Sequence, residues 1–166
     1  MTGMDRRNFV KATGAGAAGA GLTGCLGGGS DGGGGGDGPT VGILEDRSGN
    51  FALVGTPKWQ ATRLAVEEIN EQGGVLGEEV SIFDPDPQSD NTRYQQLTEQ
   101  AIQQRDVDAL WAGYSSATRE AIRPIIDRED QLYFYTTQYE GGVCDHNIFP
   151  VGATARQQLG IVIPYM

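Results

Sequence analysis

The sequence predicts an α/β domain in which a parallel β-sheet is covered by helices on both faces. Short apolar runs alternate with longer amphipathic stretches from Pro39 onwards. Clusters of Gly, Pro and Asp separate the two kinds of segment. This alternation is typical of βαβ units, whose strands are parallel and buried on both faces. Ligands of such sheets bind beyond the carboxyl ends of the strands.

The predicted strands are the apolar runs of this pattern. They are Thr40–Leu44, Val80–Phe83, Ala109–Ala112, Leu132–Tyr135 and Asn147–Val151. We expect the first strand to lie centrally in the sheet, beside the second and the third.

The predicted helices fill the intervals between strands. The first covers Thr56–Gln72 and ends at Gly73-Gly74. The spacing of its apolar residues places four of them on one face, namely Ala61, Leu64, Ala65 and Ile69. The other predicted helices are Asn91–Arg105, Ser116–Glu129 and one that begins near Thr154.

The chain is strongly acidic, with a formal net charge of −10. Acidic side chains repel phosphate, so nucleic acid is not expected as a partner. Lysine occurs only at Lys11 and Lys58. An acid-rich, lysine-poor composition favours a salt-loving source, because salt screens the repulsion between surface charges. The two cysteines, Cys25 and Cys144, do not predict a disulfide framework.

Residues 1–24 have the features of an export signal. Arg6 and Arg7 lie within Asp-Arg-Arg-Asn-Phe-Val-Lys, which resembles the twin-arginine motif. The weakly apolar stretch Ala12–Gly24 follows. As a helix it would be about 20 Å long, shorter than the ~30 Å hydrocarbon core of a membrane. Residues 1–24 are therefore predicted to be a signal peptide rather than a membrane span.

A lipid attachment site follows this signal. Leu22-Thr23-Gly24-Cys25 resembles a lipobox, in which small residues admit the peptidase and the thiol carries the lipid through a thioether. Residues 26–38 are mostly Gly with Asp and Ser, a composition typical of a flexible tether. We therefore expect export by the twin-arginine route and anchoring at Cys25 to the outer face of the cytoplasmic membrane. Residues 25–39 would be the tether and residues 40–166 the folded part.

The loops after the strands are the places to search for a site. They are Glu45–Thr56, Asp84–Asn91, Gly113–Ser116 and Thr136–Asp145. None contains a phosphate-binding glycine fingerprint, so no dinucleotide or P-loop site is expected. Asp84 and Asp86 are interpreted as a solvated turn rather than a carboxylate pair, because prolines follow both of them.

A metal site and a catalytic set are not expected either. His146 is the single histidine and has no second histidine at ligand spacing. Ser115 and Ser116 have no base near them in the sequence. The sequence therefore predicts a protein that is not an enzyme and that uses no metal or cofactor.

Three stretches carry a family resemblance. Glu67–Gly77 is similar to the end of the first helix of type I periplasmic binding proteins, the solute-binding proteins of ABC importers. Ser115–Arg119 resembles the ligand-gripping turn of that class. Tyr133–Gly141, continued by Cys144–Phe149, is similar to the branch that binds urea and short-chain amides, in which Tyr-Glu-Gly is followed by Asn-Ile.

The resemblance implies a flavodoxin-like lobe that binds a small uncharged or zwitterionic solute and delivers it to ABC permease subunits. Proteins of this class close two lobes around the ligand. The resemblance thus also implies a second lobe that is absent from this chain, so that residues 40–166 would be a truncated first lobe.

By this resemblance, four residues are assigned to the ligand: Tyr114, Ser116, Tyr135 and Thr137. Ser116 is expected at the start of a helix, where its hydroxyl and the free backbone N–H groups can donate to a carbonyl. The hydroxyls of Tyr135 and Thr137 would accept from NH₂ groups, and Tyr114 would form a wall. Ser116 could instead be only a helix cap, and Tyr135 only strand packing. The chain departs from the family at Thr136-Thr137-Gln138, where relatives are often richer in Pro.

Two other functions fit parts of the pattern. A branched-chain amino acid receptor of the same superfamily needs a carboxylate for the ammonium group, which Glu45, Asp46 or Glu140 could supply. An exported flavodoxin-like enzyme would share the fold, but the loops lack its cofactor fingerprint and catalytic set.

Overall fold

The computed structural model describes residues 38–165. Arg6, Arg7 and Cys25, which carry the predicted export signal and lipid anchor, lie outside these residues. Within the described part of the chain, no helix is both long enough and apolar enough to cross a membrane.

Five parallel strands form one sheet in the order β2-β1-β3-β4-β5. The strands are β1 (Thr40–Leu44), β2 (Ser81–Phe83), β3 (Ala109–Ala112), β4 (Tyr133–Tyr135) and β5 (Ile148–Pro150). In the register of the sheet, Val41 of β1 lies between Ile82 of β2 and Ala109 of β3. The predicted parallel sheet is therefore confirmed, as is the place of the first strand between the second and the third.

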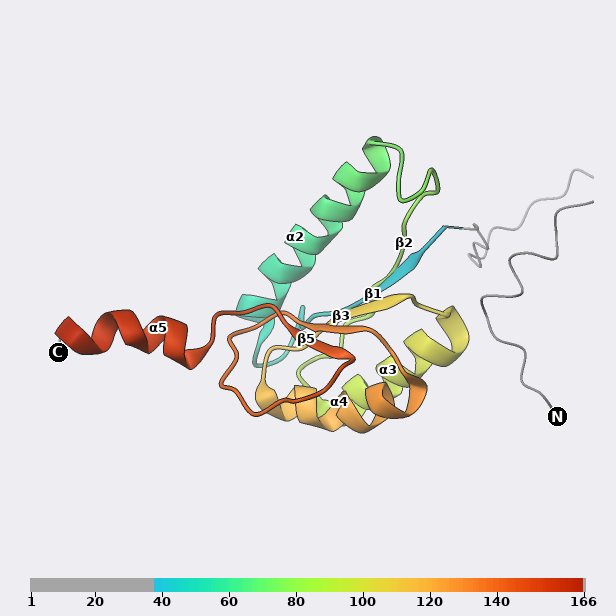
Figure 1. The fold of residues 1–166 in the computed structure, drawn as a ribbon. Helices are drawn as coiled ribbons and strands as arrows, with labels where there is room; N and C mark the ends of the chain where they lie inside the picture. The colour runs from blue at the N-terminus through green and yellow to red at the C-terminus, as the bar shows by residue number, and fades with distance from the viewer. Residues whose placement is uncertain (1–37, 166) are drawn as a thin grey trace, which may run out of the picture. The chain divides into compact units, whose positions relative to one another are not determined.

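Helices cover both faces of this sheet (Figure 1). α2 (Ala52–Glu71) lies on one face, while α3 (Asn91–Arg105) and α4 (Ser116–Glu129) lie side by side on the other. α3 and α4 have the predicted bounds. Their ends agree with local chemistry, because Asp90 caps α3 by accepting from the N–H of Arg93 at 2.7 Å. Asp106 and Asp130 end the two helices in the left-handed conformation.

α2 begins earlier than the predicted Thr56. The N–H of Gly55 donates to the carbonyl of Phe51 at 2.8 Å, so the first helical turn forms ahead of Pro57. Proline has no N–H for the carbonyl of Leu53. Leu53 is 89% exposed, so water can take the place of the missing donor. A proline at this point is thus tolerated inside the helix.

The predicted apolar face of α2 is not the face that the sheet buries. Ala61, Leu64, Ala65 and Ile69 are all exposed, whereas Gly55 and Val66 are the buried residues of this helix. The stripe that faces the sheet also contains polar side chains with partners of their own. Asn70, for example, donates to the carbonyl of Val80 at 3.0 Å and accepts from its N–H at 2.8 Å. Three of the predicted apolar residues line a groove of about 470 Å³ between α2 and the strands β1 and β3.

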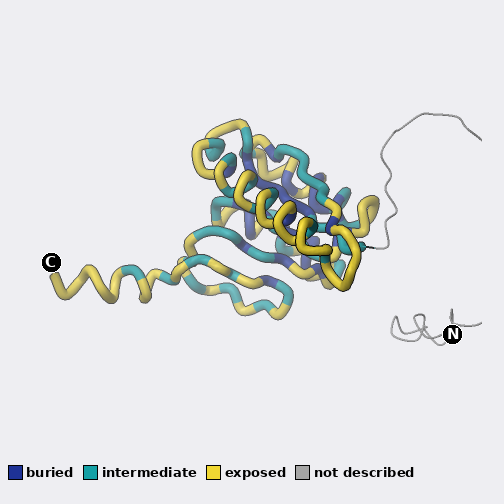
Figure 2. Tube along the Cα trace, turned by 90° about the horizontal axis from the view of Figure 1, so that it is seen from above, coloured by how far each residue is buried: buried dark blue, intermediate teal, exposed yellow. Residues whose placement is uncertain are grey.

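The core lies between the sheet and the layer of α3 and α4. Figure 2 shows the buried segments in the interior of the folded part and exposed ones around it. Its most deeply buried members come from both layers: Leu44, Tyr94, Leu110, Ile122, Ile126 and Tyr133. On the opposite face of the sheet, Trp111 stacks on Phe134 at 4.2 Å between ring centroids, and Phe134 contacts Phe149 at 5.6 Å.

The last helix, α5 (Ala155–Val162), continues into the 3-10 turn η1 (Ile163–Tyr165). It begins where predicted, because Thr154 and Gln157 form a capping box. None of the residues of α5 or η1 is buried, and Figures 1 and 2 show the segment extending away from the sheet.

Candidate functional site

The loops that follow the strands meet at the carboxyl edge of the sheet, as expected for a ligand site in this fold. The loops after β1 and β2 are joined by the N–H of Arg47, which donates to Asp86 at 3.0 Å. The loops after β1 and β4 are joined by Thr136, whose hydroxyl donates to Glu45 at 2.6 Å. Backbone and side chains from distant parts of the chain thus form one continuous surface.

The turn between β3 and α4 contains two serines with different roles. Ser115, not Ser116, is the N-cap of α4, and its hydroxyl accepts from the N–H of Thr118 at 3.1 Å. The interpretation of Ser116 as a possible cap is therefore wrong. Ser116 is the first residue of the helix and is exposed. Its hydroxyl does not cap the helix and can instead bond to Glu140 or to a ligand.

Tyr114 and Tyr135 are brought together. The hydroxyl of Tyr135 donates to the carbonyl oxygen of Tyr114 at 3.0 Å, and Tyr135 is 1% exposed. Burial raises the pKa of Tyr135, so this hydroxyl stays protonated. The Tyr114 ring lies against Phe51 with 4.9 Å between ring centroids. Tyr114 is thus part of an aromatic pair with the residue that precedes α2.

Thr137 is tied to a lysine that lies far away in the sequence. Lys58 Nζ donates to the hydroxyl oxygen of Thr137 at 3.3 Å and to the carbonyl of Gly113 at 2.9 Å. The same Nζ lies 2.8 Å from Glu45 Oε2. Burial raises the pKa of Glu45, while the ammonium group of Lys58 and the hydroxyl of Thr136 oppose that rise.

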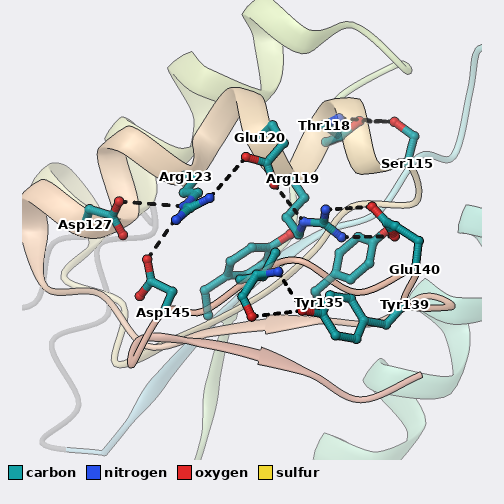
Figure 3. A network of polar contacts seen from close by, with 12 residues as sticks. Ser115, Thr118, Arg119, Glu120, Arg123, Asp127, Tyr135, Tyr139, Glu140 and Asp145 are labelled. Atoms are coloured by element: carbon teal, nitrogen blue, oxygen red, sulfur yellow. Dashed lines mark hydrogen bonds and ion pairs between the residues drawn. The ribbon is translucent and has the colours of Figure 1, made fainter. Parts of the chain in front are cut away.

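Glu140 is held by Arg119 of α4 (Figure 3). The guanidinium group donates twice to this carboxylate, at 2.7 and 3.3 Å, and its Cζ lies 4.9 Å from the centroid of the Tyr135 ring. The hydrogen bond from Arg119, followed by one from Ser116, lowers the pKa of Glu140 to about 2. Tyr139 also faces Arg119, with 5.7 Å between its ring centroid and Cζ.

Asp46 lies beneath the surface of the site. It is 1% exposed and accepts from the N–H of Ser89 at 2.6 Å. Burial raises the pKa of Asp46, and the hydrogen bond from Ser89 opposes the rise. Its second oxygen and the Tyr94 hydroxyl are both buried without a hydrogen-bond partner among the described residues. The acidic group therefore belongs to the interior rather than to the ligand surface.

Asp84 and Asp86 lie in a partly exposed turn after β2, but their carboxylates are engaged by neighbouring groups rather than fully solvated. Asp84 accepts from Trp59 Nε1 at 2.7 Å and from Arg63 at 3.0 Å. Asp86 accepts from the hydroxyl of Ser48 at 2.7 Å as well as from Arg47. Both carboxylates anchor neighbouring segments, because the turn after β2 lies directly beside α2 and the loop after β1.

The single histidine does not contribute to this site. The His146 side chain is 87% exposed, and its Nε2 lies 3.8 Å from Asp130. Between residues 38 and 165, no group of side chains has the arrangement of a metal site.

Three residues of the site were missed by the sequence reasoning: Phe51, Lys58 and Arg119. The first two lie at or near the start of α2, which the sequence pattern places too late. Arg119 belongs to the Ser115–Arg119 stretch that carried the family resemblance, but an arginine in the first turn of a helix is usually a surface residue. Here its side chain is only 4% exposed.

Comparison with known proteins agrees with this arrangement. Residues 39–166 match the model of the periplasmic binding protein family. The isoleucine-bound substrate-binding protein of a branched-chain amino acid transporter from Streptococcus pneumoniae shares 24% identity, with a TM-score of 0.60. That match covers 63% of this chain and 30% of the solved one.

Two further solved structures have the same fold. The leucine-binding protein LivK from Thermotoga maritima shares 25% identity with a TM-score of 0.53, over 60% of this chain and 27% of that chain. A fatty acid ABC transporter substrate-binding protein from Thermomonospora curvata shares 21% identity with a TM-score of 0.63, over 77% of this chain and 32% of that chain. The chain thus spans less than half the length of each of these proteins. Because the family model matches most of its length, the chain belongs to the periplasmic binding protein family, which comprises extracytoplasmic substrate-binding proteins of ABC transporters rather than enzymes.

Proposed function

We propose that this protein binds urea or a short-chain amide at the carboxyl ends of its strands and delivers it to the permease of an ABC importer. The solute would lie against Tyr114, Ser116 and Thr137, while the buried Tyr135 would support Tyr114. We further propose that the protein is a lipoprotein, exported by the twin-arginine route and anchored through Cys25.

The observation that carries this proposal is the engagement of the three carboxylates that could bind an ammonium group. Glu45 is paired with Lys58, and Glu140 is paired with Arg119. Asp46 is buried and accepts from the backbone of Ser89. An amino acid needs a free carboxylate for its ammonium group, whereas an uncharged solute does not. The described surface therefore favours an uncharged polar solute.

The hydrogen-bonding directions at the site support the same conclusion. The Tyr135 hydroxyl donates to Tyr114 and Tyr135 is buried, so Tyr135 would orient Tyr114 rather than contact the solute itself. The Thr137 oxygen already accepts from Lys58, which leaves its hydrogen and one lone pair for a solute. Thr137 can therefore donate to a solute as well as accept from it, as expected from the sequence. Urea and amides carry both a carbonyl acceptor and NH₂ donors, and so match the hydroxyls of Ser116 and Thr137, each of which can donate and accept.

Calorimetry on the mature protein with urea, acetamide, formamide and leucine tests this proposal. We expect urea or one of the amides to bind more tightly than leucine. Ser116→Ala should weaken that binding by about 1–2 kcal/mol, the size of a hydrogen bond lost from a desolvated site. Leucine binding most tightly would refute the proposal and assign the protein to amino acid transport.

Branched-chain amino acid binding is the second candidate. It is favoured by the names of the solved relatives, two of which bind isoleucine or leucine. On this alternative, the partner of the ammonium group would come from outside residues 38–165. The leucine titration above decides between the two functions.

A further inference from the structure

Lys58 occupies the point where three strands of the sheet end. Its Nζ contacts Glu45 after β1, the carbonyl of Gly113 after β3 and Thr137 after β4, at 2.8, 2.9 and 3.3 Å. The Lys58 side chain is 19% exposed, and that of Glu45 is 1% exposed. A residue of α2 thus reaches across the edge of the sheet and forms the floor of the candidate site with these partners.

The ammonium group makes two hydrogen bonds and one ion pair within this cluster. A lysine side chain carries three donors and no acceptor. Two of these donors bond to Gly113 and Thr137, and the charge of Nζ is balanced by Glu45 Oε2 at 2.8 Å. Lys58 therefore acts on a solute through its charge and through Thr137, whose own hydrogen it leaves free to donate.

The charge of Lys58 is cancelled locally by Glu45. If either residue were present alone, an unpaired charge would lie in a poorly hydrated floor, where it is costly and attracts an ion of opposite sign. Glu45 alone would attract a cation, and Lys58 alone would attract an anion. Together they leave a floor without net charge.

We propose that Lys58, paired with Glu45, is a specificity-determining residue that makes the floor of the site select uncharged solutes and leaves the hydrogen of Thr137 free to donate. This inference rests on the proposed function, since it concerns the same site. It goes beyond that function by assigning the choice of solute charge to one ion pair.

Three small molecules of nearly the same shape separate charge from size: acetamide, acetate and acetamidinium. Each is titrated by calorimetry into the mature wild-type protein and into Lys58→Met, Glu45→Gln and the double variant. Relative to acetamide, Lys58→Met should shift preference towards acetamidinium and Glu45→Gln towards acetate, each by about tenfold or more. The double variant should return to preferring acetamide.

Arg63→Met is the matched control, because it removes a cation from the same helix whose partner is Asp84 rather than a residue of the floor. It should leave the three affinities in their wild-type ratio. If Lys58→Met does not fold, the comparison of Glu45→Gln with the double variant still tests the inference. Glu45→Gln should favour acetate, whereas the double variant should favour acetamide.

Unchanged ratios in Glu45→Gln and Lys58→Met, with acetamide still bound by the wild type, would overturn the inference and leave the proposed function intact. A uniform loss of all three affinities would show a purely structural role and would likewise overturn it. A wild-type protein that binds leucine and none of the three molecules would refute the proposed function itself.

Discussion

Arg119 and Glu140 form a two-point ion pair that joins α4 to the loop after β4. The two contacts measure 2.7 and 3.3 Å, and the Arg119 side chain is 4% exposed against 48% for Glu140. Neutralising Glu140 would therefore leave a buried guanidinium group without its main partner. The loop that carries Tyr139 is thus attached to the helix by an acid-sensitive contact.

Glu140→Gln should destabilise the protein near neutral pH and lose this effect in acid. The pKa of Glu140 is lowered from 4.5 to about 2 in the folded protein. The ion pair therefore contributes fully above pH 4.5, and its contribution disappears as the pH falls through 2. Because Glu140 is half exposed, we expect a difference in unfolding free energy of only about 1 kcal/mol at pH 7. Guanidinium unfolding between pH 7 and pH 2 measures it.

Glu68→Gln is the control for this experiment, since it changes an exposed carboxylate on α2. It should have little effect at any pH. A gap between wild type and Glu140→Gln that stays constant down to pH 2 would contradict the acid-sensitive contact.

Substituting the two serines at the start of α4 should show that Ser115 contributes to stability and Ser116 to binding. Ser115→Ala removes the N-cap and should lower the unfolding free energy by about 1 kcal/mol. Ser116→Ala should leave stability nearly unchanged, because the exposed hydroxyl of Ser116 does not cap the helix. Thermal unfolding of the two variants side by side checks this. A larger loss of stability in Ser116→Ala than in Ser115→Ala would reverse the assignment.

Most of the fold could be predicted because its signals are local. Apolar runs and capping residues determine where α3, α4 and β3 begin and end, and all three have the predicted bounds. That Ser115 rather than Ser116 caps α4 shows the limit of such signals. The cap is decided by the backbone of one residue, and Ser115 has the extended conformation that a cap requires.

The floor of the site could not be predicted because its contacts are not local. Lys58 is 55 residues from Gly113 and 79 residues from Thr137 in the chain. An isolated lysine on a helix is normally a solvated surface residue. Only the placement of α2 over the edge of the sheet converts Lys58 into a partner of Glu45.

The proposed export route and lipid anchor can be tested by two variants. Replacing Arg6 and Arg7 with Lys should leave precursor in the cytoplasm, because lysine keeps the charge but not the paired guanidinium groups of the motif. Cys25→Ala should release the exported protein from the membrane, since alanine offers no thiol for a thioether. Cell fractionation and immunoblotting report both outcomes. Membrane-bound, processed protein in both variants would refute the proposed localisation.

The last prediction concerns the close approach of α2 to the loop after β1, on which the position of Lys58 depends. A Cβ on Gly55 would lie 2.1 Å from the carbonyl oxygen of Asp46, so only glycine fits there. Gly55→Ala should push the start of α2 outwards and destabilise the protein by about 1–3 kcal/mol. Lys58 lies in the next turn of the helix, so the same variant should weaken amide binding. In Gly160→Ala, by contrast, the added methyl group meets nothing within 4 Å, and stability should be unchanged or rise by about 0.5–1 kcal/mol. Guanidinium unfolding and acetamide calorimetry on both variants test this. A Gly55→Ala protein as stable as wild type, with unchanged affinity, would show that α2 can shift without disturbing the site.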